Sequence, residues 1–183
     1  MASLPELDWK PTQAKGDRHG HPVDLVVVHR WGLNYVSPAE TVAAYHGVIS
    51  EFLNPANDAS AHIVFPGSAV KGKATQMVAW KDYAWTQAAY NPRCDEVESA
   101  DAIWQGHDPE GFKVLARIVA FRLHKRGLPP VWSSGRGFCR HYDLGAAGGG
   151  HTDPTTDLHL WRSFVKLVQA EHARGHFRET WGR

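Results

Sequence analysis

The chain has 183 residues, and its 20 lysines and arginines nearly balance its 19 aspartates and glutamates, which gives a formal net charge of +1 at pH 7. Because the two signs of charge are interspersed, nothing in the sequence predicts an electrostatic surface for nucleic acid. No apolar run is long enough to span a membrane and the N-terminus lacks the basic and apolar regions of a secretory signal, so we expect synthesis in the cytoplasm without membrane insertion.

We expect one domain over residues 1–183, because a chain of this length can bury a sizeable core without a second unit. Residues 1–22 contain proline, glycine and histidine, and they predict an extended leader packed on the surface. Residues 25–28 (LVVV) are apolar without alternation, a pattern typical of a strand that is buried on both faces.

The first helix is predicted over residues 38–52. Ser37 can cap it, Pro38 suits its first position, and a glutamate three residues after the cap completes a capping box. Residues 61–65 and 74–80 are predicted strands that follow it.

A second helix is predicted over residues 109–126, with Asp108 as its cap and Gly127 just past its end. Residues 138–144 form a predicted short strand, and residues 158–174 a final helix. Strands interspersed with three helices predict an α/β fold in which a central mixed sheet is flanked by helices on both faces.

The two cysteines, Cys94 and Cys139, are too few for a disulfide framework. Two free thiols are expected in a chain that folds in a reducing compartment, with a single disulfide as the alternative. A cysteine peptidase is a competing function, but neither cysteine lies in a recognisable nucleophile context at the start of a helix.

Two histidines and an aspartate stand out as candidate metal ligands. His29 directly follows the buried strand, and His141 lies on the predicted strand further along the chain. Asp153 follows a glycine-rich stretch, residues 145–150, that lets its carboxylate fold back to the same point. Three nitrogen and oxygen ligands with one open position are typical of catalytic zinc. The alternatives are a histidine at a strand end, a surface strand histidine, and an aspartate that caps the final helix.

Motifs occur in a fixed order along the chain. They are VVVH at residues 26–29, SAHIV at 60–64, AW at 84–85 with Asn91, Glu98, and His141 with HTDP at 151–154. In this order they resemble the zinc-dependent N-acetylmuramoyl-L-alanine amidases, a family that includes phage endolysins and peptidoglycan-recognition proteins. The resemblance runs from about His29 to Trp161.

The resemblance implies a role for each matched residue. Zn²⁺ would be held by His29, His141 and Asp153. Glu98 would move a proton between the attacking water and the leaving nitrogen, and His151 would donate to the developing oxyanion. The substrate would be peptidoglycan, and a phage enzyme of this kind would act as a monomer at the bacterial wall after release by a holin. The expected substrate-binding residues are His62, Trp85 and Asn91.

Several positions depart from the family pattern and leave alternatives open. The family's S-I-G-I-E is replaced here by CDEVE, so Glu96 is a rival to Glu98, which can also be read as an exposed strand glutamate. His151 stands where relatives carry lysine or threonine, and it is an alternative ligand in place of Asp153 or His141. Thr86 replaces a family histidine.

The predicted function is hydrolysis of the amide bond between N-acetylmuramic acid and L-alanine, with cell-wall lysis as a phage endolysin. Two alternatives share the fold: a cytoplasmic amidase that recycles muropeptides, and a module that binds peptidoglycan without cleaving it. The presence of all three candidate ligands favours catalysis over binding alone.

Overall fold

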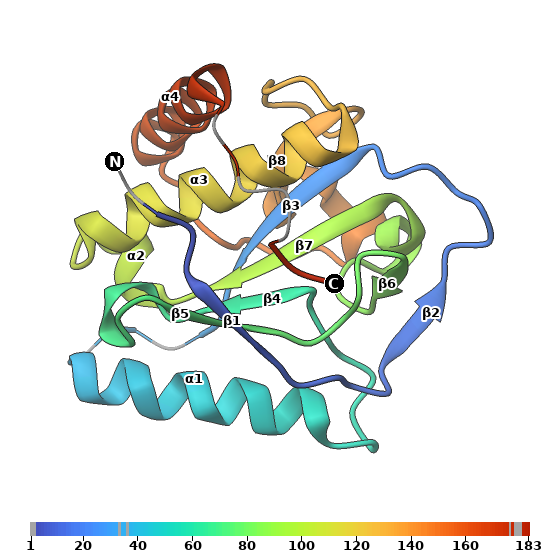
Figure 1. The fold of residues 1–183 in the computed structure, drawn as a ribbon, viewed down its shortest axis with the longest axis horizontal. Coiled ribbons are helices and arrows are strands. Elements are labelled where there is room, and N and C mark those ends of the chain that lie inside the picture. Colours follow the sequence, from blue (N-terminus) through green and yellow to red (C-terminus); the bar gives the residue numbers. More distant parts are fainter. Residues whose placement is uncertain (1–2, 33, 36, 176, 178–180) are drawn as a thin grey trace.

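Six strands form a central mixed sheet in the computed structural model, in the order β1-β5-β4-β7-β3-β8 (Figure 1). Neighbouring strands run parallel except for β4 and β5, which are antiparallel, and β2 and β6 form a separate antiparallel ribbon. The strands are β1 (Glu6–Trp9), β2 (Lys15–Asp17), β3 (Leu25–Arg30), β4 (Ile63–Phe65), β5 (Lys73–Gln76), β6 (Asp82–Ala84), β7 (Cys94–Ser99) and β8 (Gly137–Arg140). The structure describes residues 3–32, 34–35, 37–175, 177 and 181–183.

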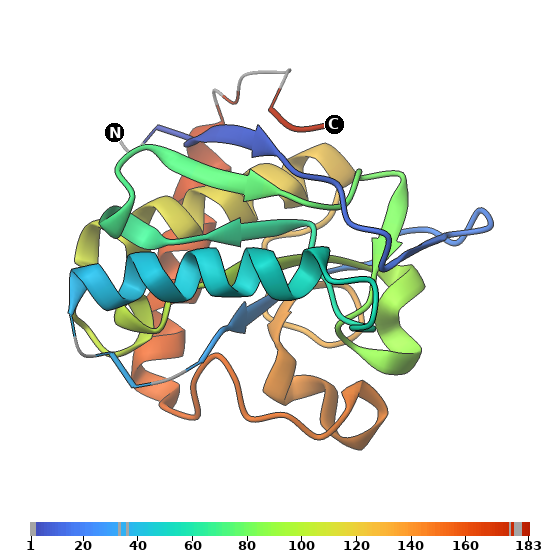
Figure 2. The same ribbon diagram turned by 90° about the horizontal axis from the view of Figure 1, so that it is seen from below.

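Helices cover the sheet on both sides, with α1 on one side and α3 and α4 on the other (Figure 1). Figure 2 shows the same layers from below, with α1 in front of the sheet and α4 behind it. This arrangement confirms the predicted α/β fold. The helices are α1 (Pro38–Leu53), α2 (Asp101–Trp104), α3 (Pro109–Arg126) and α4 (Leu158–Arg174), with 3-10 turns η1 (Gly67–Ala69), η2 (Ala88–Arg93) and η3 (His141–Gly148).

The predicted start and stop signals set the ends of the long helices. The Ser37 hydroxyl accepts a hydrogen bond from the Glu40 backbone N–H at 3.2 Å, and the Asp108 carboxylate accepts one from the N–H of Gly111 at 2.8 Å. Gly127, in the left-handed conformation at φ 61°, ends α3. The predicted bounds of α1 and α3 are therefore confirmed to within one residue.

Strand β3 is buried on both faces, as its unbroken apolar run predicts. Val26 and Val28 belong to the main core, whereas Leu25 and Val27 belong to a second, smaller cluster. That second cluster is completed by Cys94, Cys139 and Leu144. Because η3 contributes Leu144, this chain segment is packed against the sheet beside the end of β3.

Within the described part of the leader, β1 belongs to the edge of the central sheet and β2 to the separate ribbon, so this segment is paired with other strands and does more than cover the surface. Strand β1 pairs with β5 at the sheet edge, and β2 pairs with β6. Thr12 and Arg18 are both buried. These strands are short and half-exposed, so their apolar pattern is too weak to show them in the sequence.

Two further expectations need correction near the candidate ligands. Strand β8 ends at Arg140, so His141 is the first residue of η3 rather than a strand residue. The cap of α4 is Asp157, whose carboxylate accepts from the backbone N–H groups of His159 and Leu160. Asp153 is therefore not the helix cap, and its side chain is free to serve elsewhere.

Strand β7 lies in the middle of the sheet although acidic residues occupy half of it. Asp95 and Glu96 have no exposed surface, and Glu98 is 8% exposed. Asp95 is neutralised by arginines: it accepts hydrogen bonds from Arg122 at 2.6 Å and Arg126 at 2.9 Å, and a third arginine lies 3.0 Å away. Burial opposes ionisation of this carboxyl, but the charges and hydrogen bonds of the arginines outweigh it and hold the pKa of Asp95 well below its ordinary value.

Asp95→Asn is expected to destabilise the fold by about 3–5 kcal/mol, because it leaves buried guanidinium groups without their counter-charge. Its matched control is Asp24→Asn, which removes a half-exposed partner of Arg93 and is expected to cost at most about 1 kcal/mol. Urea unfolding of the metal-free protein at neutral pH measures both. Since the folded pKa of Asp95 is depressed, its contribution is present above about pH 4 and is lost as the pH falls further. Equal losses in the two variants would contradict this assignment.

Among the described residues, no helix combines the length and the apolar character needed to cross a bilayer. This finding agrees with the sequence, in which apolar runs are short.

Candidate metal centre

His29 and His141 are brought together by the register of two neighbouring parallel strands. Val28 of β3 pairs with Arg140 of β8, so the two histidines follow one paired position at the same edge of the sheet. Their ring centroids lie 4.5 Å apart. Both side chains are almost completely buried, at 1% and 3% exposed. The carboxyl ends of parallel strands commonly carry binding sites, and here they place two imidazoles at one point.

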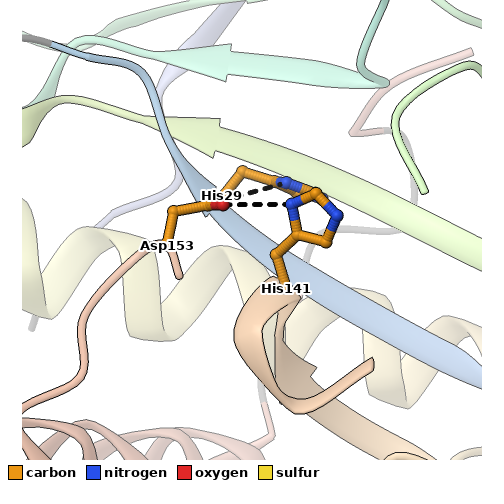
Figure 3. Close-up of side chains that lie close together, drawn as sticks. All are labelled: His29, His141 and Asp153. Carbon is orange, nitrogen blue, oxygen red and sulfur yellow. Dashed lines mark hydrogen bonds and ion pairs between the residues drawn. The ribbon is translucent and has the colours of Figure 1, made fainter. Parts of the chain in front are cut away.

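Asp153 completes the cluster from the loop that precedes α4 (Figure 3). One of its carboxylate oxygens lies 3.1 Å from Nδ1 of His141, and the other lies 3.4 Å from Nδ1 of His29. Two backbone contacts hold the loop: the N–H of Arg30 donates to Oδ2 of Asp153, and the N–H of Tyr142 donates to its carbonyl. The three candidate ligand atoms all lie within 4.8 Å of one another.

The hydrogen bonding of His141 indicates which ring nitrogen can bind a metal. Its Nε2 lies 2.7 Å from the carbonyl oxygen of Gly148, which can only accept, so Nε2 carries a proton. A neutral His141 then presents the lone pair of Nδ1 to the carboxylate of Asp153. The short contact between Nδ1 of His141 and this carboxylate fits either a proton on Nδ1 or a metal cation bound by both groups. The donor set of two imidazoles and one carboxylate is one that zinc accepts.

The pKa values of the three candidate ligands are shifted by burial and by their mutual contacts. Burial disfavours the imidazolium form of His141, but the hydrogen bond and charge of Asp153 outweigh it and raise the pKa of His141. Burial lowers the pKa of His29 despite the same neighbour. Burial works against ionisation of Asp153, yet its hydrogen bonds with the two histidines hold the pKa of Asp153 far below its usual range. The carboxylate is therefore anionic and ready to bind a cation.

Glu98 lies beside the three candidate ligands on the next strand. It pairs with His29 in the β3–β7 register, and its Oε1 lies 3.9 Å from Nδ1 of that histidine. Its Oε2 is buried and has no hydrogen-bond partner among the described residues. Burial, followed by the charges of Asp153 and Glu96, raises the pKa of Glu98 well above its ordinary value. An exposed strand glutamate, the alternative reading, does not fit this burial.

Glu96 points to the same face of the sheet but lies deeper in the protein. Its Oε2 is 3.2 Å from the Thr86 hydroxyl and 3.4 Å from Nδ1 of His62, and the residue has no exposed surface. His151, in contrast, lies at the rim, with 57% of its side chain exposed. Its ring is stacked 4.3 Å from that of His141, and its Nδ1 is 3.9 Å from a carboxylate oxygen of Asp153.

The expected substrate-binding residues do not gather at this cluster. His62 is completely buried, with its ring stacked on Trp80 at 5.2 Å between centroids. Trp85 and Asn91 line a separate shallow recess beside η2. Asn91 also stabilises the neighbouring backbone: its side-chain oxygen accepts hydrogen bonds from the backbone N–H groups of Thr86 and Gln87.

A mostly apolar groove of about 700 Å³ opens next to the cluster, and sequence reasoning missed it. Glu98 is one of its lining residues, and many of the others belong to α1. The other lining residues include Trp31, Tyr35, Thr41, Ala44, Val48, Phe52 and Asp101. No signal in the sequence marked this surface, because it is assembled from a loop, a helix face and a strand end.

The two cysteines are free, as predicted; both are buried, and they do not support a cysteine peptidase. Burial raises the pKa of the Cys94 thiol well above its ordinary value, and burial likewise raises the pKa of Cys139. A nucleophilic cysteine needs a lowered pKa and access to substrate, and neither thiol has these properties.

In sequence, the chain matches no family model and no curated protein. In three dimensions it is similar to the Staphylococcus aureus hydrolase AmiA, with a TM-score of 0.69 and 17% identity over 93% of this chain and 84% of that one. It is also similar to AmpD, with a TM-score of 0.61 and 19% identity over 91% and 97% of the two chains. LysC, an N-acetylmuramoyl-L-alanine amidase from Clostridium intestinale, has a TM-score of 0.53 and 12% identity over 87% and 97%. At these identities the likeness establishes a shared fold.

Proposed function

We propose that this protein is a zinc-dependent amidase that hydrolyses the bond between the lactyl group of N-acetylmuramic acid and L-alanine in peptidoglycan. One observation carries the proposal: two imidazole Nδ1 atoms and the Asp153 carboxylate converge beside a groove that Glu98 lines. The shared fold supports the same reading, because LysC is an amidase of this specificity.

His29, His141 and Asp153 would hold the zinc, which when bound polarises an amide carbonyl and makes water more acidic. Glu98 is placed to handle the proton. Its carboxylate accepts a proton from the attacking water and later gives it to the leaving nitrogen of alanine as the C–N bond breaks. Because Oε2 of Glu98 has no hydrogen-bond partner among the described residues, this oxygen is available for that exchange.

His151 is proposed to donate a hydrogen bond to the oxyanion that develops on the carbonyl. Its exposed position at the rim and its stacking on His141 place it beside the ligands without burying it. The alternative in which His151 is itself a ligand is less favoured, because the compact cluster of candidate ligand atoms consists of His29, His141 and Asp153.

The groove along α1 is proposed to hold one part of the substrate while its scissile amide lies at the metal centre. Trp85 and Asn91 are proposed to contact another part through the recess beside η2. His62 is buried, so its contribution to substrate binding would be indirect, through the wall that it supports.

Cell-wall lysis as a phage endolysin is the proposed biological role, with monomeric action at the wall after holin-dependent release. A muropeptide-recycling amidase is the alternative, because the fold alone does not separate the two roles: it is shared with AmpD and with a Bacillus subtilis endolysin. A non-catalytic binding module is less favoured because the ligands and Glu98 are all present.

Mass spectrometry of the products released from purified sacculi tests the proposal. The zinc-loaded protein is expected to release peptides with an N-terminal alanine and to leave the glycan strands intact, and the chelated protein is expected to release none. Turnover of soluble muropeptides with intact sacculi left uncut would favour the recycling role. Binding to sacculi with no released peptide would show a binding module, and cleavage within the glycan or the peptide would overturn the assignment.

A further inference from the structure

Gln87 contacts the candidate ligand His29 from the side opposite Asp153. It lies between β6 and η2 and has no exposed surface. Its side-chain Nε2 is 2.6 Å from Nε2 of His29, while its Oε1 is buried without a partner among the described residues. A fully buried carboxamide aimed at the outer nitrogen of a metal ligand has no role in the function proposed above.

The loop that carries Gln87 is held at several points. Oδ1 of Asn91 accepts from the backbone N–H of Gln87 at 2.6 Å and from that of Thr86 at 3.1 Å. The hydroxyl of Thr86 donates to the carbonyl of Ser60, and the hydroxyl of Ser60 accepts from the backbone N–H of Trp85 at 2.9 Å. These contacts hold the backbone at Gln87 and at the two residues before it, which keeps its carboxamide against the imidazole.

The chemistry of a ligand imidazole determines what Gln87 must do there. When Nδ1 of His29 binds a metal, Nε2 must carry the ring proton, and this buried N–H needs an acceptor. The amide nitrogen of Gln87 has no lone pair to offer, whereas Oε1 does. A half-turn of the carboxamide about its last bond exchanges the two atoms in the same space. His141 already shows the equivalent arrangement, with its Nε2 against the carbonyl oxygen of Gly148.

We propose that Gln87 is a positioning residue of the metal centre: its side-chain oxygen accepts the Nε2–H of His29 and so keeps Nδ1 available for the metal. The proposal rests on the proposed function insofar as the site must bind a metal.

Zinc affinity in three variants tests the proposal, measured by competition with a chromophoric chelator. Gln87→Met keeps much of the size but removes the acceptor, so it is expected to weaken zinc binding by about 10–100-fold, the usual cost of losing an outer partner of a ligand. Gln87→Glu restores an acceptor oxygen whether or not it is ionised, so its affinity should return close to that of the wild type. Gln169→Met is the matched control, because it makes the same chemical change at an exposed position of α4 outside this loop, and it should leave the affinity unchanged.

Nitrogen-15 NMR of the histidine side chains supplies a readout that loss of stability alone would not move. The zinc-loaded wild type should show two protected Nε2–H signals from ligand imidazoles, one from His29 and one from His141. Gln87→Met should lose or shift one of them, and Gln87→Glu should retain both. If the methionine variant fails to fold, this measurement on the wild type still shows whether Nε2 of His29 carries the ring proton.

The outcomes separate this proposal from the function on which it rests. A wild-type protein that binds no zinc overturns the metal centre and the role of Gln87 together. Zinc binding that is unchanged in Gln87→Met overturns only the role of Gln87. A loss of zinc affinity in Gln87→Glu as large as that in Gln87→Met would show that the amide acts as a donor. The same conclusion would follow if His29 of the wild type carried its proton on Nδ1 when zinc is bound.

Discussion

Replacing His141 by alanine is expected to abolish stoichiometric zinc binding and, with it, amide hydrolysis. The variant removes one of the three proposed ligands, which together form the compact cluster of candidate ligand atoms found among the described residues. The loss of affinity should exceed the roughly 10–100-fold expected for an outer partner, since here the metal bond itself is lost. His29→Ala and Asp153→Ala should behave alike. Equilibrium dialysis followed by metal analysis measures the loss.

A thermal readout gives independent evidence for the same prediction. Zinc at about 1,000 times its dissociation constant stabilises the folded state by about 4 kcal/mol, so the wild type should unfold at a higher temperature with zinc than with a chelator. The three ligand variants should lose this difference. His151→Ala is the matched control, because it removes a neighbouring exposed imidazole and should keep the zinc. If Asp153→Ala kept full zinc while His151→Ala lost it, the third ligand would be His151.

Glu98→Gln is expected to lower turnover by about 10²–10⁴-fold while zinc remains bound, the usual scale for losing general acid–base help. Glutamine keeps the shape of the side chain but cannot accept the proton of the attacking water. Single-turnover rates on zinc-saturated protein, with metal content measured on the same sample, separate this loss from a loss of the metal.

Glu96→Gln is the matched control, because it makes the same chemical change two residues away on the same face of β7. Oε2 of Glu96 is held against Thr86 and His62, whereas Glu98 lines the groove. The control should therefore retain most of its rate. Wild-type rates in Glu98→Gln together with a collapse in Glu96→Gln would transfer the proton-handling role to Glu96.

Local signals in the sequence were sufficient for the elements that are long and regular. A helix cap, a proline and an apolar period predicted α1, and an unbroken apolar run predicted β3. Both predictions were possible because each pattern reflects contacts within a few residues. The convergence of His29 with His141 followed from the positions of two strands. The leader strands were missed because their pairing partners are distant in sequence.

The side chains that surround the candidate ligands were harder to predict from the sequence. β7 is rich in acids, which in a single sequence indicates an exposed segment, yet arginines from α3 and the leader make its burial possible. Gln87 carried no signal of its own, because its significance depends on a contact with His29 across 58 positions. Periodicity cannot report interactions of this kind, since they depend on the complete fold.

Under the proposed function, the groove separates the residues that select the substrate from the residues that act on it. The atoms proposed for chemistry come from β3, β7, η3 and the loop before α4, whereas much of the groove lining comes from solvent-facing positions of α1 such as Ala43, Ala44 and Gly47. Substitutions at exposed helix positions usually alter stability by only a few tenths of a kcal/mol. Under the proposed function, substrate preference can therefore be altered on one helix while the residues proposed for chemistry stay unchanged.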